Sequence, residues 1–437
     1  MAITFIPRRW QRITLIVFLV LALPVAVFWF YIPQTPSTLT IASGYEGGTY
    51  EQFAQRLQKE LKKEGVDLIL QRTQGSIDNL NLLKDPNSKI DFALFQSGVA
   101  DPKKYPNIVS LAGIFYEPLW IWYRVESFRK EGGKLSQFNQ LIGKRISIGN
   151  HGSGTQVLAK ELITANQISF DSMKVYALNP TEAAKKLQQG EIDVAFLVSS
   201  TQAPVLKSFY ENQNIHLMNL NHAEAYSKIL PYLSHVVVPR GLLSITKDYP
   251  REDLNLVSPT AVLVARDDIS PAIVSLLMRA SVRVLKNDPG TERDANFPSS
   301  ERLEFPQHID AEIYLKEGPS FLYSNLPFWG AVWVGRFLKI FIPLLVIFPF
   351  FAYVPALLRY SFRRRLWQFY KELKVIERIS ITEENYLNLL NRLEQLDKRV
   401  LNLKISTLAP KEYHDLRAHI NFARSRIEQS IDRLSRT

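Results

Sequence analysis

The chain of 437 residues contains no cysteine. This absence excludes disulfide bonds, thiol catalysis and zinc sites built on thiolates, and it removes the residue to which a lipoprotein anchor is attached. Histidine is also scarce: seven residues are scattered along the chain, and neither an HExxH motif nor a paired-carboxylate pattern occurs. We therefore expect no metal site, no cofactor and no enzymatic activity.

The central part of the chain also lacks net charge, although the formal net charge of the whole chain is +11. Residues 33–335 contain 31 Lys and Arg against 32 Asp and Glu, so the basic excess lies near the two ends of the sequence. Each basic cluster lies beside a long apolar run. This position favours contact with the anionic lipid of a bilayer, and nucleic acid is not an expected partner.

Two apolar runs without charge, 13–32 and 340–358, have the length that spans a bilayer. Arginines precede the first run and follow the second, which by the positive-inside rule puts both termini in the cytoplasm. The first run also resembles a cleaved signal peptide, but its length favours a retained anchor. We predict a two-pass protein of the inner (plasma) membrane, divided into cytoplasmic 1–12, transmembrane 13–32, periplasmic or extracellular 33–325, interfacial and transmembrane 326–358, and cytoplasmic 359–437.

The predicted external domain repeats a pattern of strand, glycine turn and helix. The pattern occurs in TLTIASGYEGGTYEQFAQRL, from Thr38, and in ISIGNHGSGTQVLAKELI, from Ile146. A second pair of stretches, KIDFALFQSGVAD and EIDVAFLVSSTQAP, places an apolar strand between an Ile-Asp pair and polar residues. Alternating strands and helices predict an α/β fold with a mainly parallel sheet. The repetition predicts two similar lobes that face each other across a cleft and close on a ligand by a hinge.

Several of these motifs, taken in order, resemble one family. SGYEGGTY, TQGSIDN, FQSG, YEPL, GNHGSGT and EIDVAFLVSS are similar, in order and spacing, to stretches of the TAXI-type solute-binding subunits of TRAP transporters. PRGLLSITKDYP, SPTAVLVARDDIS and KEGPSFLYSNLPFW resemble a subgroup with a C-terminal membrane helix. The resemblance implies a periplasmic-binding-protein-like domain that captures a small organic anion or amino acid, such as a dicarboxylate or glutamate. Such proteins pass their ligand to a TRAP-type membrane permease driven by an ion gradient.

The glycine turns and strand ends supply the candidate ligand-binding residues. A turn at the start of a helix presents free N–H groups and the positive end of the helix dipole, which bind an anion without a charged side chain. We predict that Gly48 and Thr49 hold a ligand carboxylate, that Tyr50 supplies a hydroxyl, and that Glu117 accepts a ligand ammonium. The full predicted set is Gly47, Gly48, Thr49, Tyr50, Ser76, Gln96, Ser97, Glu117, Gly152, Ser153, Gly154, Thr155, Ser199 and Ser200.

The same residues have simpler structural interpretations. The glycine turns connect a strand to a helix in many proteins, and Ser76 has the residue type of an ordinary helix cap. Glu117 is equally compatible with a hydrogen-bonded turn acid. The HGSGT turn fits neither a nucleophile elbow, which needs glycine at the positions of His151 and Thr155, nor a phosphate-binding loop, which needs lysine at Thr155. These mismatches agree with a binding protein rather than an enzyme.

The segment after the second apolar run has helical periodicity. Trp367, Leu373 and Ile376 belong to one apolar stripe, a second stripe covers 386–400, and a third helix is predicted at 414–434. Pairing of the last two helices as an antiparallel hairpin or coiled coil would make a docking or self-association element, and a solvated stalk is the simpler alternative. Two functions follow: ligand delivery to a transporter, or a transmembrane sensor that relays lobe closure to this tail.

Overall fold

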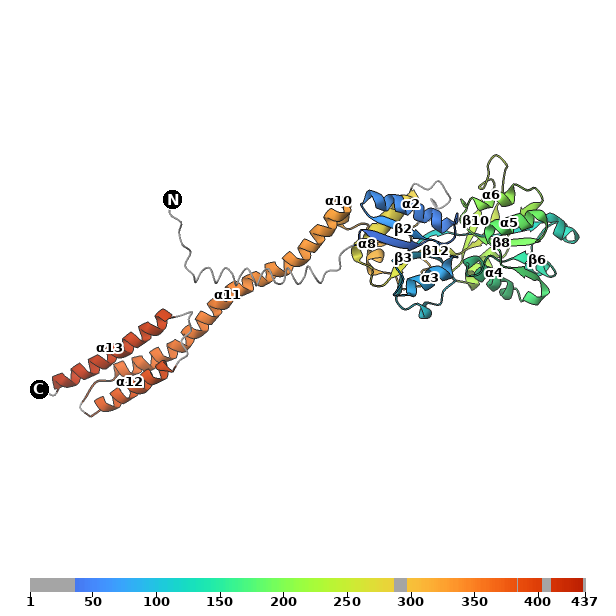
Figure 1. Ribbon diagram of the computed structural model, residues 1–437. Coiled ribbons are helices and arrows are strands. Elements are labelled where there is room, and N and C mark those ends of the chain that lie inside the picture. The colour runs from blue at the N-terminus through green and yellow to red at the C-terminus, as the bar shows by residue number, and fades with distance from the viewer. Residues whose placement is uncertain (1–35, 287–296, 383, 403–409, 435–437) are drawn as a thin grey trace, which may run out of the picture. The chain divides into compact units, whose positions relative to one another are not determined.

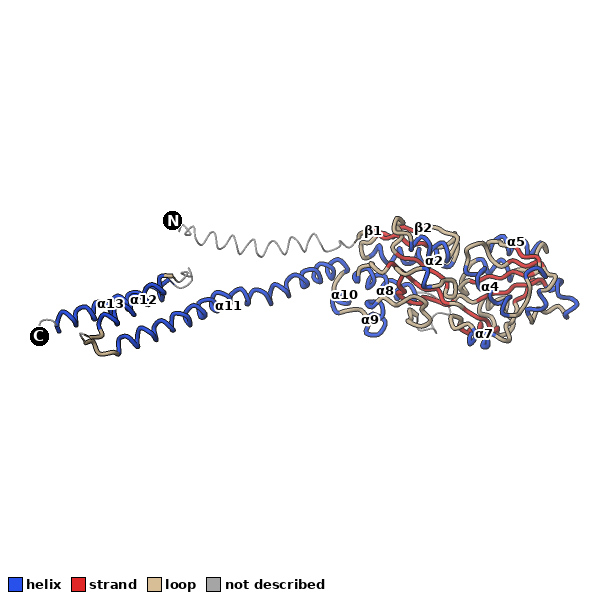
Figure 2. Tube along the Cα trace, turned by 90° about the horizontal axis from the view of Figure 1, so that it is seen from below, coloured by secondary structure: helices blue, strands red, loops and turns tan. Residues whose placement is uncertain are grey.

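The computed structural model describes residues 36–286, 297–382, 384–402 and 410–434. The first predicted membrane segment, 13–32, lies outside these described residues. The chain forms two compact units, of which Ile32–Gly335 is the larger. This larger unit contains two lobes, each with helices packed around a sheet (Figures 1 and 2). The predicted two-lobed α/β fold is confirmed.

Lobe 1 contains a five-stranded sheet of order β2-β1-β3-β12-β4. Its strands are β1 (Thr38–Ala42), β2 (Asp67–Gln71), β3 (Phe92–Gln96), β4 (Ile108–Tyr116) and β12 (Thr260–Arg266). Its helices are α2 (Thr49–Lys63), α3 (Ser76–Lys84), α8 (Pro271–Lys286), α9 (Ile309–Glu317) and α10 (Phe321–Asn325). β1 is parallel to β2 and β3, whereas β12 is antiparallel to β3 and β4.

Lobe 2 contains a second five-stranded sheet, of order β7-β6-β8-β5-β9, and a two-stranded sheet of β10 and β11. The strands are β5 (Leu119–Arg124), β6 (Arg145–Ser147), β7 (Lys174–Tyr176), β8 (Val194–Val198), β9 (Ile215–Leu217), β10 (Ser234–Val238) and β11 (Leu254–Ser258). The α-helices are α4 (Gly154–Ala165), α5 (Pro180–Gln189), α6 (Val205–Tyr210) and α7 (Ala223–Ile229). β6 is parallel to β7 and β8, whereas β5 is antiparallel to β8 and β9.

The two large sheets share one plan, with three parallel strands followed by an inserted antiparallel strand and an edge strand. The inserted strands are β5 and β12. The chain crosses from lobe 1 into β5 directly after β4, and it returns into β12 directly after β11. In each large sheet four of the five strands point in one direction and the crossing strand runs against its neighbours, so the prediction of a mainly parallel sheet is confirmed in part. The hinge consists of the two short connections between the lobes, 117–118 and 259. A hydrogen bond joins them, donated by the Glu117 N–H to the Pro259 carbonyl at 3.0 Å.

The two Ile-Asp pairs tie neighbouring strands together in the same way in both lobes. The carboxylate of Asp91, directly before β3, accepts the N–H of Thr40 in β1 at 2.7 Å. The carboxylate of Asp193, directly before β8, accepts the N–H of Arg145 in β6 at 2.8 Å. In both pairs the aspartate N–H donates in return to the carbonyl of the same partner. The repeated sequence thus encodes a structural connection between strands.

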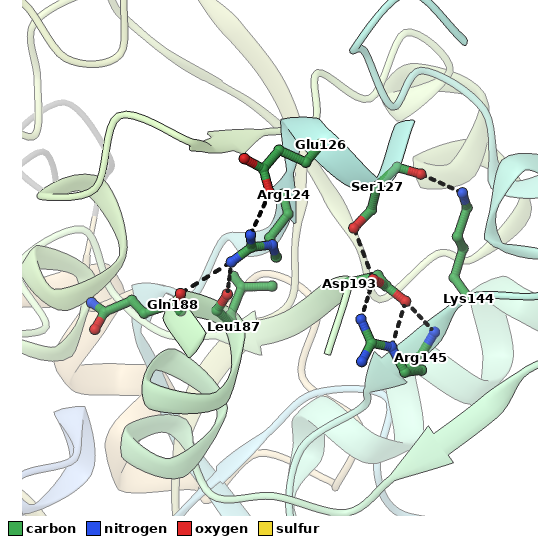
Figure 3. A network of polar contacts seen from close by, with 8 residues as sticks. All are labelled: Arg124, Glu126, Ser127, Lys144, Arg145, Leu187, Gln188 and Asp193. Atoms are coloured by element: carbon green, nitrogen blue, oxygen red, sulfur yellow. Dashed lines mark hydrogen bonds and ion pairs between the residues drawn. The ribbon is translucent and has the colours of Figure 1, made fainter. Parts of the chain in front are cut away.

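Asp193 is also the centre of a polar network in lobe 2 (Figure 3). The Arg145 guanidinium donates to the Asp193 carboxylate through Nε at 3.0 Å and Nη2 at 2.8 Å, and the Ser127 hydroxyl donates at 2.8 Å. Burial alone would raise the pKa of Asp193, but these hydrogen bonds outweigh burial and lower it. The carboxylate is therefore held in its ionised form by fixed donors.

The helix α2 connects the first glycine turn with the far side of lobe 1. Phe53, Leu57 and Leu61 recur every four residues on one face, and all three are fully buried in the lobe 1 core. At its C-terminal end, Gly65 approaches Trp329 so closely that an added Cβ would lie 3.2 Å from the indole Nε1. Phe328, the first residue of α11 (Phe328–Arg378), is buried in the same core. The beginning of α11 is therefore part of lobe 1.

Charged pairs reinforce this junction. Glu64, directly after α2, lies 3.1 Å from Arg279 and 2.9 Å from Arg283 of α8. Burial opposes its ionisation, but the two arginines and the backbone of Phe328 together lower the pKa of Glu64. Glu60 adds a further pair with Arg283 at 3.2 Å. The junction of α2, α8 and α11 is thus held by both packing and charge.

The helices after residue 335 form a hydrophobic core of their own, separate from the cores of the two lobes. α11, α12 (Tyr386–Leu401) and α13 (Pro410–Leu434) contribute its buried residues. These are Leu366, Leu373, Ile376, Leu389, Leu393, Leu396, Val400, Tyr413, Leu416, Ile420, Ala423 and Ile427. Trp367, expected on the apolar stripe, is 63% exposed because Leu366 faces the core instead. A coiled coil and self-association stay predictions.

Asp397 is the one acidic side chain buried in this core among the described residues. It lies on α12, and its carboxylate faces Arg417 at 3.8 Å and Arg424 at 3.5 Å on α13. A buried charge of this kind favours one register of two packed helices over others, because a shifted register would separate it from its partners.

No helix in the described part of the chain has the combination of length and apolar character needed to cross a membrane. The predicted run 340–358 is helical and belongs to α11. Its assignment as a membrane span is therefore not confirmed and stays a prediction from the sequence.

Candidate functional site

A small cavity lies between the two lobes, beside the hinge. Its volume is about 40 Å³. One water molecule needs roughly 10–15 Å³ of such space, so the cavity has room for a few water molecules in this conformation. Its walls are Gly44, Tyr45, Gly48, Thr49, Tyr50, Gln74, Gly75, Ser76, Gln96, Glu117, Ser153, Gly154, Thr155 and Val198. A larger depression of about 570 Å³ lies on lobe 2, but none of the predicted residues lines it.

Nine of the fourteen predicted ligand-binding residues line this cavity. They are Gly48, Thr49, Tyr50, Ser76, Gln96, Glu117, Ser153, Gly154 and Thr155. They come from both lobes and from the hinge, as the repeated glycine turns had indicated. Their ligand-binding role itself stays a prediction.

Three helices begin at the cavity. α2 starts after Gly48, α3 after Gly75 and α4 after Ser153, which caps its helix by accepting the N–H of Gln156 at 3.2 Å. The first N–H groups of a helix have no acceptor within the helix and carry the positive end of its dipole. Gly75 has φ 136° and ψ −155°, a conformation that glycine adopts far more readily than other residues. The starts of three helices therefore border the cavity. The N–H of Gly48 is already bonded to the Tyr45 carbonyl at 3.1 Å, which disagrees with its predicted role as a donor to the ligand.

Glu117 is the single carboxylic acid among the lining residues, and none of them is Lys, Arg or His. Glu117 is only 4% exposed. Its Oε2 accepts a hydrogen bond from the Tyr50 hydroxyl, with 2.8 Å between the two oxygens. Burial raises the pKa of Glu117 to about 8, although the bond from Tyr50 partly opposes the shift. Burial and the nearby Glu117 also raise the pKa of both Tyr45 and Tyr50. At neutral pH the side chains around the cavity are therefore largely uncharged.

The two lobes contact each other across the cavity. Gln96 of lobe 1 donates through Nε2 to the Gly154 carbonyl of lobe 2 at 3.1 Å, and an added Cβ at Gly154 would lie 2.2 Å from the Gln96 side chain. The Ile77 N–H donates to the Gly152 carbonyl at 3.3 Å. These contacts define a closed form in which a larger residue at position 154 would displace the Gln96 side chain.

Five predicted residues do not line the cavity. Gly47 is exposed, and its N–H donates to Glu51 at 2.6 Å. Gly152 contacts lobe 1 through its carbonyl, as described above. The Ser97 hydroxyl accepts a hydrogen bond from the Thr260 N–H at 2.8 Å, beside the hinge. Ser199 and Ser200 are buried, and the Ser200 N–H donates to the Thr49 hydroxyl at 3.4 Å. Strand-end position alone did not reveal that these side chains turn away from the cavity.

Five lining residues were not predicted: Gly44, Tyr45, Gln74, Gly75 and Val198. Four of them lie within the same motifs, SGYEGGTY and TQGSIDN, so the motifs located them even though the residues were not selected. Val198 ends β8, and its N–H is held by the Thr155 hydroxyl at 3.0 Å. No polar signal in the sequence could identify an apolar wall residue of this kind.

A two-lobed α/β fold, with a hinge and a cavity whose walls come from both lobes, is the architecture that the sequence predicted for a solute-binding protein. Residues 41–317, more than half of the chain, match the NMT1-like family. The chain belongs to the NMT1-like family. Members of this family are substrate-binding proteins and not enzymes, in agreement with the prediction. Among the residues that the structure describes, no group of three or more His, Asp or Glu side chains is arranged to hold a metal ion.

The solved structures that match this chain are distant in sequence. The alkanesulfonate-binding protein from Xanthomonas axonopodis pv. citri, bound to MOPS, is 13% identical, with 65% of this chain and 85% of that chain covered and a TM-score of 0.39. An ancestral arginine-binding protein bound to arginine is 13% identical, with 58% and 95% covered and a TM-score of 0.38. The effector-binding domain of a BenM variant is 12% identical, with 59% and 98% covered and a TM-score of 0.39.

Proposed function

We propose that this solute-binding protein captures a small amino acid in the interlobe cavity. One observation carries the proposal: the cavity combines backbone donors from three helix N-termini with a single buried carboxyl group, Glu117, and with no cationic side chain. The donors suit a ligand carboxylate. The carboxyl group suits a ligand ammonium.

An amino acid uses both features, whereas a dicarboxylate uses only one. The carboxylate of an amino acid accepts N–H groups at the starts of α2 and α4, and its ammonium faces Glu117. A second ligand carboxylate in place of the ammonium would meet Glu117 without any cation to balance the two. A nearby ammonium favours the ionised form of a carboxyl group. Because the pKa of Glu117 in the ligand-free cavity is about 8, binding of an amino acid at pH 7 releases a proton.

Access to the cavity requires the lobes to separate. The closed form leaves about 40 Å³, and contacts such as Gln96 to Gly154 lie directly across it. A ligand enters while the lobes are apart, and closure then excludes water and strengthens each electrostatic contact inside. The small volume favours amino acids with short side chains.

We further propose that the protein is anchored in the inner membrane by 13–32 and 340–358, with its two lobes in the periplasm, and that it delivers its ligand to a TRAP-type permease. The TAXI-like motifs and the arginines that flank both apolar runs support this proposal. The second candidate is a transmembrane sensor. It is favoured by α2, which begins at the cavity and ends against the first residues of α11.

Calorimetric titration of the purified full chain tests the ligand class. Glycine, alanine, serine and glutamate are compared with succinate and malate at pH 7, in two buffers with different heats of ionisation. We expect an amino acid to bind with release of up to one proton. Glu117→Gln should weaken binding and abolish proton release, whereas the exposed control Glu131→Gln should change neither. Tight binding of a dicarboxylate, without binding of any amino acid, would contradict the proposal.

Affinity capture of the tagged full chain from its own membranes separates the two modes of action. Recovery of a permease subunit supports transport. Recovery of a histidine kinase or response regulator, without a permease, supports the sensor instead and overturns the transport proposal.

A further inference from the structure

A second contact between the lobes lies outside the cavity. Lobe 1 contributes Gly98 and Glu304, and lobe 2 contributes Glu161 of α4 and Tyr232, which precedes β10. None of these four residues lines the cavity. The contact is therefore separate from the cavity and does not touch a ligand held there.

The side chain of Tyr232 fits directly against Gly98. A Cβ added to Gly98 would lie 2.2 Å from the Tyr232 ring, and Gly98 has φ +86°, so a larger residue has neither the space nor the backbone conformation. Ser97 donates from its hydroxyl to the Tyr232 carbonyl at 3.3 Å. Nearby, the Arg302 guanidinium of lobe 1 donates to the Ser234 hydroxyl of lobe 2. Each of these contacts requires the closed form.

Two carboxyl groups face each other at this contact. The Tyr232 hydroxyl donates to Glu161 Oε2, and Glu304 Oε1 accepts the Gly98 N–H. The second oxygen of Glu304, Oε2, is buried and has no hydrogen-bond partner within the described residues. The ionisable groups that face Glu304 are Glu161 and Tyr232, and among the residues that the structure describes no cation is paired with it. An ionised Glu304 would thus be both poorly solvated and repelled by Glu161.

We propose that Glu304, Glu161 and Tyr232 form a proton-linked latch, in which the closed form holds a proton on Glu304 and loss of that proton opens the lobes. These residues act on ligand binding through lobe closure, so they are positioning residues rather than ligand contacts. The latch does not depend on the identity of the ligand.

The direction of the effect follows from the two environments of Glu304. In the closed form, burial raises its pKa to about 7, the Gly98 and Ala100 N–H groups oppose the shift, and Glu161 adds to it. Opening moves Glu161 and Tyr232 away and lets water reach Oε2, so the pKa returns toward its usual value of 4.5. The closed form therefore binds the proton more tightly. The ratio of closed to open protein is therefore highest below about pH 5. It falls by up to about tenfold per pH unit as the pH rises toward 7, because opening releases one proton.

The lack of native cysteine allows a direct measurement of closure in the ligand-free full chain. The exposed residues Lys59 of lobe 1 and Lys185 of lobe 2 are each changed to cysteine and spin-labelled. Pulsed electron spin resonance then reports the distance between the lobes from pH 5 to pH 8. We expect the ratio of closed to open protein to fall at least tenfold over this range.

Variants assign this pH dependence to the latch. Glu304→Gln, a neutral group of the same shape, should stay closed at pH 8 with a flat profile. Glu161→Gln should weaken the pH dependence, because it removes the repulsion alone. The exposed Glu301→Gln is the matched control and should behave as the unchanged protein. Repeating the series with Glu117→Gln removes any contribution of the cavity carboxyl.

Two results would overturn the proposal. One is an interlobe distance that does not change between pH 5 and pH 8, whether the lobes are open or closed. The other is a pH profile that Glu304→Gln leaves intact. Since no ligand is added, neither result depends on whether the cavity binds an amino acid.

Discussion

Replacement of Glu117 by glutamine should stabilise the protein at high pH while it weakens ligand binding. The pKa of Glu117 in the folded protein is raised from the usual 4.5 to about 8 by burial, so the folded state holds the proton more tightly than the unfolded state. The stability that this proton contributes is fully present below about pH 4.5, and it is lost as the pH rises through 8. Glutamine keeps an oxygen that accepts the Tyr50 hydroxyl but cannot ionise.

The size of the effect follows from the pKa difference. Each pH unit between the pKa of Glu117 in the unfolded protein and its pKa in the folded protein lowers the unfolding free energy by about 1.4 kcal/mol. The buried carboxyl therefore costs roughly 3 kcal/mol of unfolding free energy at pH 7 and roughly 5 kcal/mol at pH 9, but less than about 1 kcal/mol at pH 5. A cost of this size at one residue in the cavity is expected where function, and not stability, selects the residue.

Thermal unfolding of the full chain, with and without Glu117→Gln, tests this reasoning at pH 5 and pH 9. The variant should unfold several degrees higher than the unchanged protein at pH 9 and at nearly the same temperature at pH 5. The exposed Glu131→Gln should show no such difference. If Glu117→Gln unfolded at a lower temperature at both pH values, Glu117 would be a paired structural acid, and its assignment to the ligand site would be wrong.

Three further changes test other parts of the structure. Gly154→Ala should reduce ligand affinity at least tenfold with little change in melting temperature, because its Cβ would meet Gln96 2.2 Å away; unchanged calorimetric affinity would contradict this. Asp193→Asn should cost about 1–3 kcal/mol in urea unfolding by weakening its bonds to Arg145, and the loss should shrink as the pH falls below 4. Asp397→Ala should speed hydrogen exchange in α12 and α13, and unchanged exchange would exclude a role in their packing.

Much of the site could be predicted because local sequence patterns encode it. Glycine turns before apolar helical periodicity located the starts of α2, α3 and α4, and the two Ile-Asp stretches showed that the lobes repeat one plan. Gly48 and Gly154 were selected on these grounds and Glu117 from the YEPL motif, and the structure brings all three together at one cavity. Patterns within about 20 residues were sufficient for this part.

The remaining features depend on contacts between distant parts of the chain. The insertion of β12 between β3 and β4 reverses the expected strand direction, and no local pattern signals that a strand near residue 260 returns to lobe 1. Ser97 and Ser199 were placed in the cavity because strand ends usually meet there, but side-chain direction at a strand end depends on the neighbouring strand. The contact of Gly98 with Tyr232 joins residues more than 130 positions apart, and glycine alone does not reveal it.

The junction of α2 with the first residues of α11 has a consequence for motion. Phe328 and Trp329 belong to the packing of lobe 1, and Glu64 and Arg283 fix the same corner with charge. Lobe 1 is therefore the stationary half with respect to the start of α11, and lobe 2 is the half that swings when the hinge bends. A partner that distinguishes loaded from empty protein must then read the position of lobe 2, and labels on lobe 1 would report almost no movement relative to that junction.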